Sequence, residues 1–319
     1  MNALNTSLIV PLNYSKTDCE VGIIHVGVGA FHRAHQAVYM NTLLGNKDQQ
    51  KWGIMGINLR SQDANINLQL ADQKHLYTLK TLSPENHATY EEIGSILSTL
   101  DWSTNAETAA QAVDNKNVHL ITMTVTESGY YLLENGQLDT HSPIIIEALQ
   151  GFGSCIYAYL RASLNVRRLG CNMPITLLCC DNLRDNGLYL KSGFEQFLRA
   201  CNDTELLKWV AIKVTFPCCM VDRITPRTDA IHIADIKQKF DLHDPLIVMS
   251  ESFTQWVIED NFAGPRPDFE RVGVEIVTEV SPYEDAKIRI LNGGHTILAY
   301  FAALKGYKTY DQGLADEEL

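Results

Sequence analysis

Three polar residues near the C-terminal end of the chain have types and spacing that suit proton transfer. Read as an α-helix, the stretch 284–295 places Lys287, His295 and Asn292 at roughly 0°, 80° and 140° around its axis. Apolar residues stand between them, so this helix should be packed against the protein. Burial penalises only the charged form of a lysine, which makes Lys287 a candidate general base. From this segment alone, a surface lysine beside a half-buried histidine is the simpler interpretation.

The bulk composition indicates a globular protein that acts on small molecules. The chain has 319 residues, enough for two domains, of which 45% are hydrophobic and 20% are charged. A net charge of −12 argues against a nucleic-acid or membrane partner, because both need a positive surface. The eight cysteines lack zinc-like spacing, and no secretory signal or membrane-spanning run is visible. We therefore expect a cytoplasmic protein with reduced thiols.

A glycine turn near the N-terminus predicts a dinucleotide site. The apolar run Val21–Val26 is typical of a strand buried in a parallel sheet, and a helical stretch to about Leu44 follows the turn. Gly27 would allow the tight turn, Gly29 would let the backbone approach phosphates, and the helix start supplies unpaired N–H groups. His32 replaces the third glycine of the usual fingerprint, so the motif is weak when taken alone.

Further strands and helices predict an α/β fold with a Rossmann-like, doubly wound sheet. We expect strands over 52–59, 119–125, 174–180 and 272–280, helices over 106–113 and 143–169, and an irregular segment over 227–245. The dinucleotide-binding domain should cover residues 1–281. Residues 282–319 should begin a mainly α-helical C-terminal domain.

The residues that could select the cofactor follow the second strand. Asp63 is the nearby carboxylate that could hold the adenosine ribose, whereas Arg60 could equally face a 2′-phosphate. We favour NAD over NADP. His32 and His35 stand three residues apart and could clasp a metal, but no third ligand is spaced to complete a zinc site. We expect no metal.

A polar turn in the middle of the chain follows the strand predicted over 174–180. Asn182 in this turn would lie at the carboxyl end of a parallel strand, where open α/β sheets bind ligands. An N-cap for the next helix is the alternative role for this part of the chain. Asp222 and Arg223 have apolar neighbours, so we expect them to be paired rather than bare surface charges.

Six segments together resemble the mannitol dehydrogenase family of polyol-specific long-chain dehydrogenases. They are Gly27–His35, Thr126–Tyr130, Asp181–Gly187, Met220–Ile224, Gln255–Asp260 and Lys287–His295. They follow the family's order from about residue 20 onward. Within the family they are most similar to D-arabinitol 4-dehydrogenases, and next to mannitol 2-dehydrogenases.

The resemblance implies NAD-dependent, metal-independent oxidation of a sugar alcohol to a ketose, with D-arabinitol to D-xylulose favoured. It implies that Lys287 is the general base and that Asn182 and Asn292 stabilise the developing alkoxide. His295 would bind substrate hydroxyls, and Glu284 would relay protons to solvent. The expected cofactor-binding residues are Gly27, Gly29, Phe31, His32, Arg33, Asp63, Thr126, Glu127 and Asp222.

Two departures from the family pattern lead to further expectations. Cys218 stands where a more polar residue is expected, with little consequence. Family members continue into a C-terminal domain that closes over the substrate, so we expect this chain to be truncated. Its last helix should then expose the apolar side chains of Ile290, Leu298, Tyr300 and Phe301.

Two other functions are compatible with the sequence. A truncated chain could bind NAD without catalysing turnover. A related hexuronate reductase would need a cationic contact for the substrate carboxylate, and Arg223 and Arg289 are the hints of one, although structural salt bridges explain both equally simply.

Overall fold

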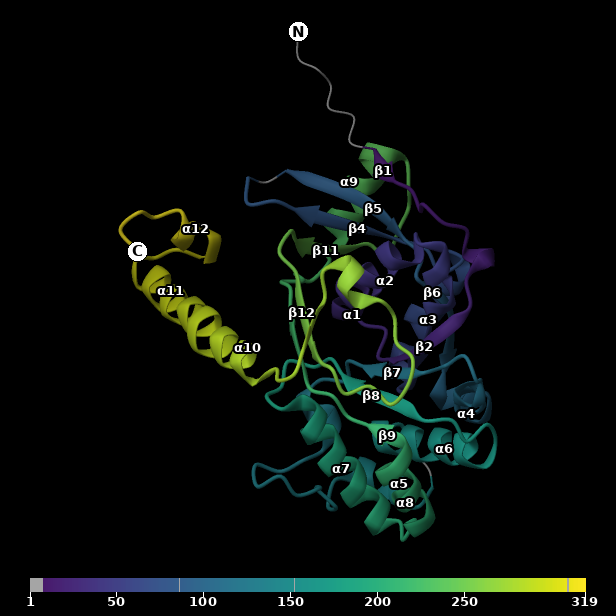
Figure 1. Ribbon diagram of the computed structural model, residues 1–319. Coiled ribbons are helices and arrows are strands. Elements are labelled where there is room, and N and C mark those ends of the chain that lie inside the picture. The colour runs from purple at the N-terminus through teal and green to yellow at the C-terminus, as the bar shows by residue number, and fades with distance from the viewer. Residues whose placement is uncertain (1–7, 86, 152, 309) are drawn as a thin grey trace.

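The computed structural model describes residues 8–85, 87–151, 153–308 and 310–319, and its largest sheet has six parallel strands (Figure 1). The strand order is β6-β3-β2-β7-β8-β9. These strands are β2 (Val21–Val26), β3 (Gly53–Asn58), β6 (Ile96–Asp101), β7 (Leu120–Met123), β8 (Ile175–Cys179) and β9 (Val214–Thr215). The chain moves outward from β2 on one side and from β7 on the other. This order confirms the predicted Rossmann-like, doubly wound fold.

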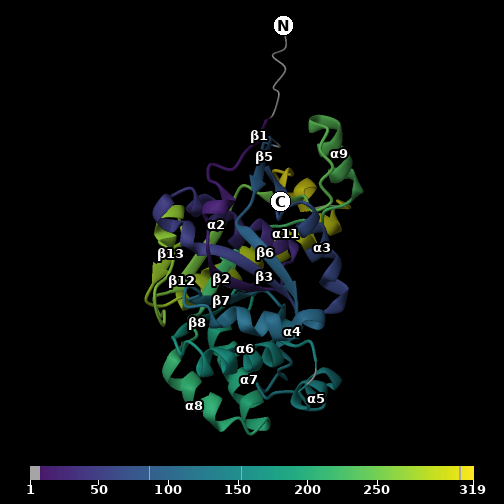
Figure 2. The same cartoon turned by 90° about the vertical axis from the view of Figure 1, so that its right-hand side faces the viewer.

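Helices cover both faces of this sheet, which explains why its central strands are continuous apolar runs. Ile24 of β2 packs on one side with α4 (Trp102–Gln111), α6 (Ile156–Leu169), α7 (Asn186–Ala200) and α8 (Thr204–Lys213). Ile23 packs on the other side with α2 (Gln36–Leu44), which continues the short α1 (Ala30–Ala34). Figure 2 shows β6, β3, β2, β7 and β8 between these layers. Helix α3 (Ala64–Asp72) follows β3.

Two smaller sheets join segments that are far apart in the sequence. The first has the order β1-β5-β4-β11, formed by β1 (Ile9–Val10), β5 (Ala88–Ile93), β4 (Tyr77–Leu82) and β11 (Val248–Glu251). The second has the order β10-β12-β13, formed by β10 (Cys219–Asp222), β12 (Gln255–Glu259) and β13 (Glu275–Val277). Pairing with β12 in the second sheet holds Val221 and Asp222 in place at the edge of the molecule where the C-terminal helices begin.

Three predicted elements in the second half of the chain differ from the structure. The single helix over 143–169 is two helices, α5 (Pro143–Leu149) and α6, because Gly151 and Gly153 between them have φ of +91° and +116°. The irregular segment over 227–245 contains helix α9 (Ala230–Phe240), which is capped by the Asp229 carboxylate. The strand over 272–280 is reduced to β13, because the 3₁₀ turn η6 (Phe269–Val272) occupies its start.

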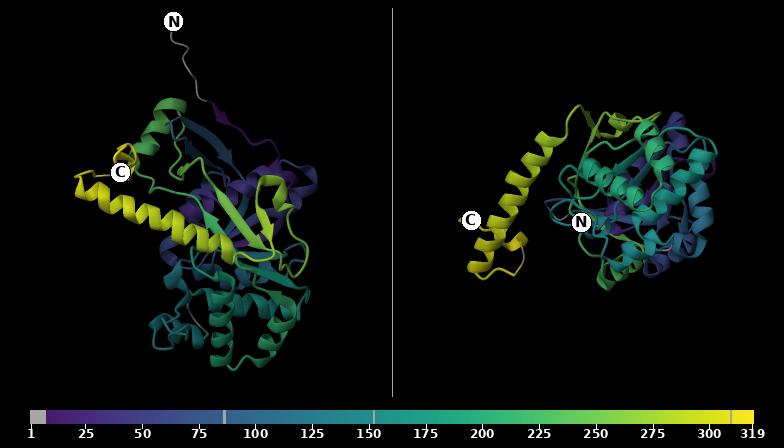
Figure 3. Two further views of the ribbon diagram at one scale, coloured as in Figure 1. Left: turned by 60° about the vertical axis from the view of Figure 1, so that its left-hand side comes forward. Right: turned by 90° about the horizontal axis from the view of Figure 1, so that it is seen from below.

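Three consecutive C-terminal helices form a rod at the edge of the molecule, and a fourth folds back beside its end (Figures 1 and 3). The rod consists of α10 (Ser281–Ala286), η7 (Lys287–Asn292) and α11 (Gly293–Leu304), and the fourth helix is α12 (Tyr310–Leu314). The continuous α-helix predicted over 284–295 is wrong, because η7 is a π-helical turn. Ile290, Tyr300 and Phe301 are exposed, as expected, whereas Leu298 is half-buried. None of the described helices is long and apolar enough to cross a bilayer.

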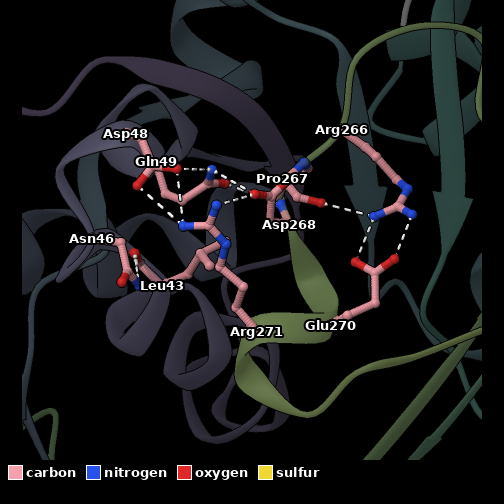
Figure 4. Close-up of polar contacts among 9 residues, drawn as sticks. All are labelled: Leu43, Asn46, Asp48, Gln49, Arg266, Pro267, Asp268, Glu270 and Arg271. Atoms are coloured by element: carbon pink, nitrogen blue, oxygen red, sulfur yellow. Dashed lines mark hydrogen bonds and ion pairs between the residues drawn. The ribbon is translucent and has the colours of Figure 1, made fainter.

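A cluster of ion pairs fixes the connection between β12 and β13 to the 3₁₀ turn η2 (Lys47–Trp52) (Figure 4). Arg271 contacts the carboxylates of Asp48 at 2.9 Å and Asp268 at 2.8 Å. Arg266 binds Glu270 through both terminal nitrogens, at 2.8 and 2.7 Å. Arg271 and its two partners are about half exposed, so these pairs contribute little to stability. Their role is to orient a surface segment.

Candidate active site

One pocket lies at the carboxyl ends of β2 and β7, where the order of the strands reverses. We call it the glycine pocket, and its volume is about 240 Å³. Its wall includes the predicted cofactor residues Gly27, Gly29, Asp63 and Thr126. Open α/β sheets bind their ligands at such switch points, so the pocket has the position expected of a dinucleotide site.

The turn at the base of the glycine pocket requires glycine at position 27. Gly27 has a φ of +97°, and a Cβ atom there would clash with the carbonyl oxygen of Thr124. A Cβ atom added at Gly29 would meet no described atom within 4 Å, so the backbone is open to a ligand there. His25 supports the turn from below, because its Nε2 donates to the Gly27 carbonyl oxygen at 3.1 Å. His25 was not among the site residues predicted from the sequence.

Three of the predicted cofactor residues support the turn through buried or stacked side chains. The His32 ring stacks on His25 with 3.4 Å between centroids, and burial lowers the pKa of His32 well below its ordinary value. The Arg33 side chain is buried and donates to the carbonyl oxygen of Leu246. Phe31 stacks on His35, with 5.1 Å between the ring centroids. None of these three is among the described residues that line the glycine pocket.

The His35 ring is held by a backbone carbonyl oxygen. Its Nε2 donates to the carbonyl oxygen of Gln255 at 2.8 Å, and burial lowers its pKa to about 3. Within the described ranges, no group of three or more His, Cys, Asp or Glu residues is placed to hold a metal ion.

Asp63 and Arg60 both line the glycine pocket and bind each other. The Arg60 Nε lies 2.9 Å from an Asp63 carboxylate oxygen, and the Arg60 side chain is 62% exposed. Asp63, predicted to hold the ribose, and Arg60, which could hold a 2′-phosphate, therefore form an ion pair with each other. This arrangement orients the Asp63 carboxylate at the rim of the pocket.

The wall of the glycine pocket contains a strained residue. Thr126 has φ of 66° and ψ of 160°, a region that non-glycine residues avoid at a cost of about 1–3 kcal/mol. Its backbone N–H donates to Asp181 Oδ1 at 2.9 Å, while Asp181 Oδ2 accepts from Val125 N–H at 3.1 Å and Tyr130 O–H at 2.6 Å. Burial raises the pKa of Asp181, and these hydrogen bonds oppose the rise. Glu127 follows Thr126 and is exposed.

A second pocket, the lysine pocket, has a volume of about 170 Å³ and is lined in part by Asn182, Glu284, Lys287 and Asn292. The Lys287 Nζ donates to Asn182 Oδ1 at 2.8 Å and to the Val221 carbonyl oxygen at 2.9 Å. The Lys287 side chain is only 10% exposed. The structure thus brings four of the five predicted catalytic residues to one cavity.

Asp222 lies beside the lysine pocket rather than the glycine pocket. Its carboxylate is 3.5 Å from Lys287 Nζ, because β10 carries it to the edge where the C-terminal helices begin. The geometry therefore associates this predicted cofactor residue with the lysine.

Asn186 anchors the turn that carries Asn182. Its side chain is fully buried, accepts from the Cys219 N–H at 2.9 Å, and donates to the carbonyl oxygens of Cys219 at 2.7 Å and Asp181 at 3.1 Å. The turn and β10 therefore form one unit, and β10 supplies the Val221 carbonyl that binds Lys287. Asp181 and Asn186 were not predicted as site residues. Both belong to the polar turn after β8, and this was the available sequence signal.

The π-helical turn η7 accounts for the position of Asn292. A π-helix forms hydrogen bonds from i to i+5, so it brings residues five apart closer to one side than an α-helix does. Lys287 and Asn292 are five apart, and both line the lysine pocket. His295 lies beyond η7, is half-buried, and is not among the described lining residues.

Glu284 is a nearly buried acid one turn before Lys287. It is 4% exposed, and its carboxylate oxygens accept from the Asp185 N–H at 3.2 and 3.4 Å. Burial is the largest cause of its raised pKa. A carboxyl group with a raised pKa exchanges protons closer to neutral pH than an ordinary glutamate does.

The lysine pocket offers an amine and two amides to one small ligand. Since Asn182 Oδ1 accepts from Lys287, the Nδ2 group of the same amide faces away and can donate to a ligand oxygen. Asn292 provides a second amide in the same wall. This set can accept a proton from a hydroxyl group and hold the negative oxygen that results.

Sequence comparison relates the chain to sugar-alcohol dehydrogenases. It is 42% identical over 283 residues to a D-arabinitol 4-dehydrogenase of Klebsiella pneumoniae, covering 89% of this chain and 62% of the relative. It is 39% identical over 294 residues to a mannitol 2-dehydrogenase of Cereibacter sphaeroides, covering 92% and 61% of the two chains. The chain thus spans about three fifths of the length of these relatives.

Two solved structures have the same fold. D-sorbitol dehydrogenase in its substrate-free form aligns with a TM-score of 0.91 and 32% identity, over 97% of this chain and 64% of that one. Pseudomonas fluorescens mannitol 2-dehydrogenase, in a ternary complex with NAD and D-mannitol, aligns with a TM-score of 0.87 and 36% identity, over 94% and 61%. Residues 21–271 match the mannitol dehydrogenase Rossmann domain, and residues 279–319 match the mannitol dehydrogenase C-terminal domain. The chain therefore belongs to the mannitol dehydrogenase family.

Proposed function

We propose that this chain carries the cofactor site and the proton-accepting lysine of a cytoplasmic, NAD-dependent polyol dehydrogenase. The observation that carries this proposal is the contact of Lys287 Nζ with Asn182 Oδ1 at 2.8 Å, in one cavity with Asn292. Eight free cysteines suit a reducing compartment.

The glycine pocket fits a dinucleotide. Gly27 makes the tight turn, Gly29 leaves the backbone open for a pyrophosphate, and Asp63 in the same wall provides a carboxylate for a ribose hydroxyl. The presence of NAD in the aligned mannitol 2-dehydrogenase supports NAD as the occupant. Bound there, NAD supplies the acceptor for the hydride that leaves the carbinol carbon.

The residues of the lysine pocket then manage the proton and the charge. Lys287 takes the hydroxyl proton as the carbon–hydrogen bond breaks. The amides of Asn182 and Asn292 donate to the oxygen while it carries negative charge. Glu284 takes the proton onward to solvent, a role that suits a buried acid with a raised pKa. His295 orients a second hydroxyl of the substrate.

The charges near the pocket favour a neutral polyol over a sugar acid. Arg223 is buried and donates to the carbonyl oxygens of Ala34 and Glu251. Arg289 is 72% exposed and lies 3.7 Å from Asp285. Arg184 in the pocket wall also pairs with Asp285, at 3.0 Å. The nearby arginines thus already have carbonyl or carboxylate partners.

Among polyols, we propose oxidation of D-arabinitol to D-xylulose. Two D-arabinitol 4-dehydrogenases, of Klebsiella pneumoniae and Ralstonia nicotianae, are 42% and 40% identical to this chain. Mannitol 2-dehydrogenases, at 39% identity and below among the relatives compared, support D-mannitol as the alternative substrate.

The test incubates the protein with NAD and, in separate reactions, D-arabinitol, D-mannitol or a hexuronate. We expect NADH to form in the reactions that contain a polyol and not in the reaction that contains the hexuronate. NADH should form fastest with D-arabinitol, and the product should be a ketose. Calorimetric binding of NAD without NADH formation would instead support a chain that binds nucleotide but does not turn over. Absence of NAD binding would refute the proposal altogether.

A further inference from the structure

Asp181 lies between the glycine pocket and the lysine pocket and contacts both. Its carboxylate accepts from the backbone N–H groups of Val125 and Thr126, which line the glycine pocket. Asp181 itself lines the lysine pocket, next to Asn182. The side chain is nearly buried, so these contacts are not shared with bulk solvent.

The bond from Asp181 to Thr126 restrains a strained backbone. Thr126 occupies φ of 66° and ψ of 160°, which a threonine keeps only where the surroundings hold it there. The hydrogen bond from Thr126 N–H to Asp181 Oδ1, at 2.9 Å, is a contact that does so. A ligand that contacts Thr126 and shifts its backbone would therefore also shift the Asp181 carboxylate.

The backbone of Asp181 is also held. Its carbonyl oxygen accepts from Asn186 Nδ2 at 3.1 Å, and the same amide group binds the Cys219 carbonyl oxygen on β10 at 2.7 Å. Asn182, the next residue, accepts from Lys287 at 2.8 Å. A displacement of Asp181 thus reaches the amide that faces the lysine.

We propose that Asp181 is a positioning residue that couples occupancy of the glycine pocket to the placement of Asn182 beside Lys287. This inference rests on the proposed function, because NAD is the occupant. Asp181 exchanges no proton in the reaction. Its oxygens already accept from Thr126, Val125 and Tyr130, and the role of its charge is to hold these donors.

Asp181→Asn should break one of these bonds selectively. Oδ2 accepts from Val125, Tyr130 and the Cys179 thiol, so the single amide oxygen of asparagine should take that place. The amide NH₂ then faces the Thr126 N–H, and the bond is lost. We expect NAD to bind roughly tenfold more weakly.

Thr126→Gly in the same chain provides a rescue. Glycine adopts a positive φ without strain, so the double variant should bind NAD with nearly wild-type affinity. Asp203→Asn is the matched control, because Asp203 is another largely buried carboxylate with several donors, at the start of α8. Its NAD affinity should be unchanged.

Hydrogen–deuterium exchange on the full chain, with and without saturating NAD, tests the coupling itself. In the wild type, NAD should protect both the 27–29 turn and the 182–186 turn. In Asp181→Asn, and in the double variant, NAD should protect 27–29 alone. A merely structural role of Asp181 would not separate the two turns in this way.

Several results would overturn the inference. One is that NAD protects 182–186 as strongly in Asp181→Asn as in the wild type. Another is that adding Thr126→Gly to Asp181→Asn does not restore the affinity for NAD. A third is that Asp203→Asn loses as much affinity for NAD as Asp181→Asn does. Should Asp181→Asn not fold, Thr126→Gly alone carries the test, because an unstrained backbone at this position can change conformation without passing the movement on to Asp181. NAD should then protect 182–186 less than in the wild type and protect 27–29 equally. A wild-type chain that does not bind NAD refutes the proposed function, and the inference with it.

Discussion

Two lysines in this molecule have similar burial and an aspartate neighbour, but their environments differ. Lys80 is 11% exposed and contacts Asp235 at 2.8 Å, whereas Lys287 is 10% exposed and lies 3.5 Å from Asp222. Lys80 belongs to strand β4, with the Tyr90 ring 5.8 Å from its amine. Lys287 donates to two neutral oxygens, those of Asn182 and Val221, and lines a cavity.

The difference separates a structural ion pair from a candidate reactive amine. A close carboxylate stabilises the ammonium ion and holds it in place. Neutral acceptors orient an amine with less stabilisation of its charge, and a cavity gives a substrate access to it. Burial and a nearby acid alone would therefore not identify the base. The partners of the amine do.

The largest expected effect is the loss of turnover on replacing Lys287. Lys287→Ala should lower the rate of polyol oxidation roughly 10³-fold, because general base catalysis contributes about that factor, and should leave NAD binding intact. Lys80→Ala should keep the rate and lower the midpoint of thermal unfolding. Initial rates and calorimetry on both variants make the comparison, and an equal loss of rate in both would remove the distinction.

The neutral acceptor beside Lys287 should matter next. Asn182→Ala removes both the oxygen that orients the amine and the amide that donates to the alkoxide, so we expect a rate loss of roughly 10²-fold. Tyr90→Phe is the counterpart at the other lysine, because it removes the hydroxyl that donates to Asp235 at 3.0 Å. Its rate should not change. Steady-state kinetics on both proteins would show whether the two surroundings are in fact different.

Asp235 tests the structural side of the comparison. Burial would raise its pKa, but hydrogen bonds from Lys80, Lys239 and Tyr90 outweigh burial and lower it to about 2. A lowered pKa stabilises the fold above the unfolded value of 3.8, and this contribution is lost as the pH falls through about 2. Asp235→Asn should lower the free energy of unfolding at neutral pH by about 1 kcal/mol. Urea unfolding across acid pH should also show a flatter pH dependence in the variant, and an unchanged curve would contradict this assignment.

Glu284, in the wall of the lysine pocket, should change stability with pH by a smaller amount and with the opposite sign. Burial raises the pKa of Glu284 above its ordinary 4.5, so the folded state binds more protons than the unfolded state in that interval. Stability from this group is present at low pH and falls as the pH rises through its raised pKa. Glu284→Gln should abolish that slope in a series of thermal melts. Parallel slopes in variant and wild type would mean that Glu284 does not titrate there.

The parallel sheet could be predicted because its signal is local. The run Val21–Val26 is β2 to the residue, because a strand covered on both faces is a nearly continuous apolar run. The pairing of Val248 with Leu79 in the second sheet has no such signal, because it depends on segments far apart in the sequence. Helix α9 was hidden by its polar composition, although Asp229 at its start is a readable cap.

The candidate site was predicted in its members more than in its geometry. Motif resemblance named Lys287 and Asn182, which are 105 residues apart and in contact. It did not show that the side chains of His32 and Arg33 face the core, because that depends on residues packed over them, such as His25 and Leu246. The π-helical turn left no trace, since its apolar residues also fit an α-helical period.

The π-helical turn η7 also determines which way the side chains of the following helix α11 face around the helix axis. Each residue added to or removed from a helix rotates the following residues by about 100°. Deleting Arg289, an exposed residue within η7, would restore an ordinary α-helical period while swinging α11 and its exposed Tyr300 and Phe301 around the axis. One residue in this segment therefore decides both whether Asn292 lines the lysine pocket and in which direction the apolar surface of the rod points.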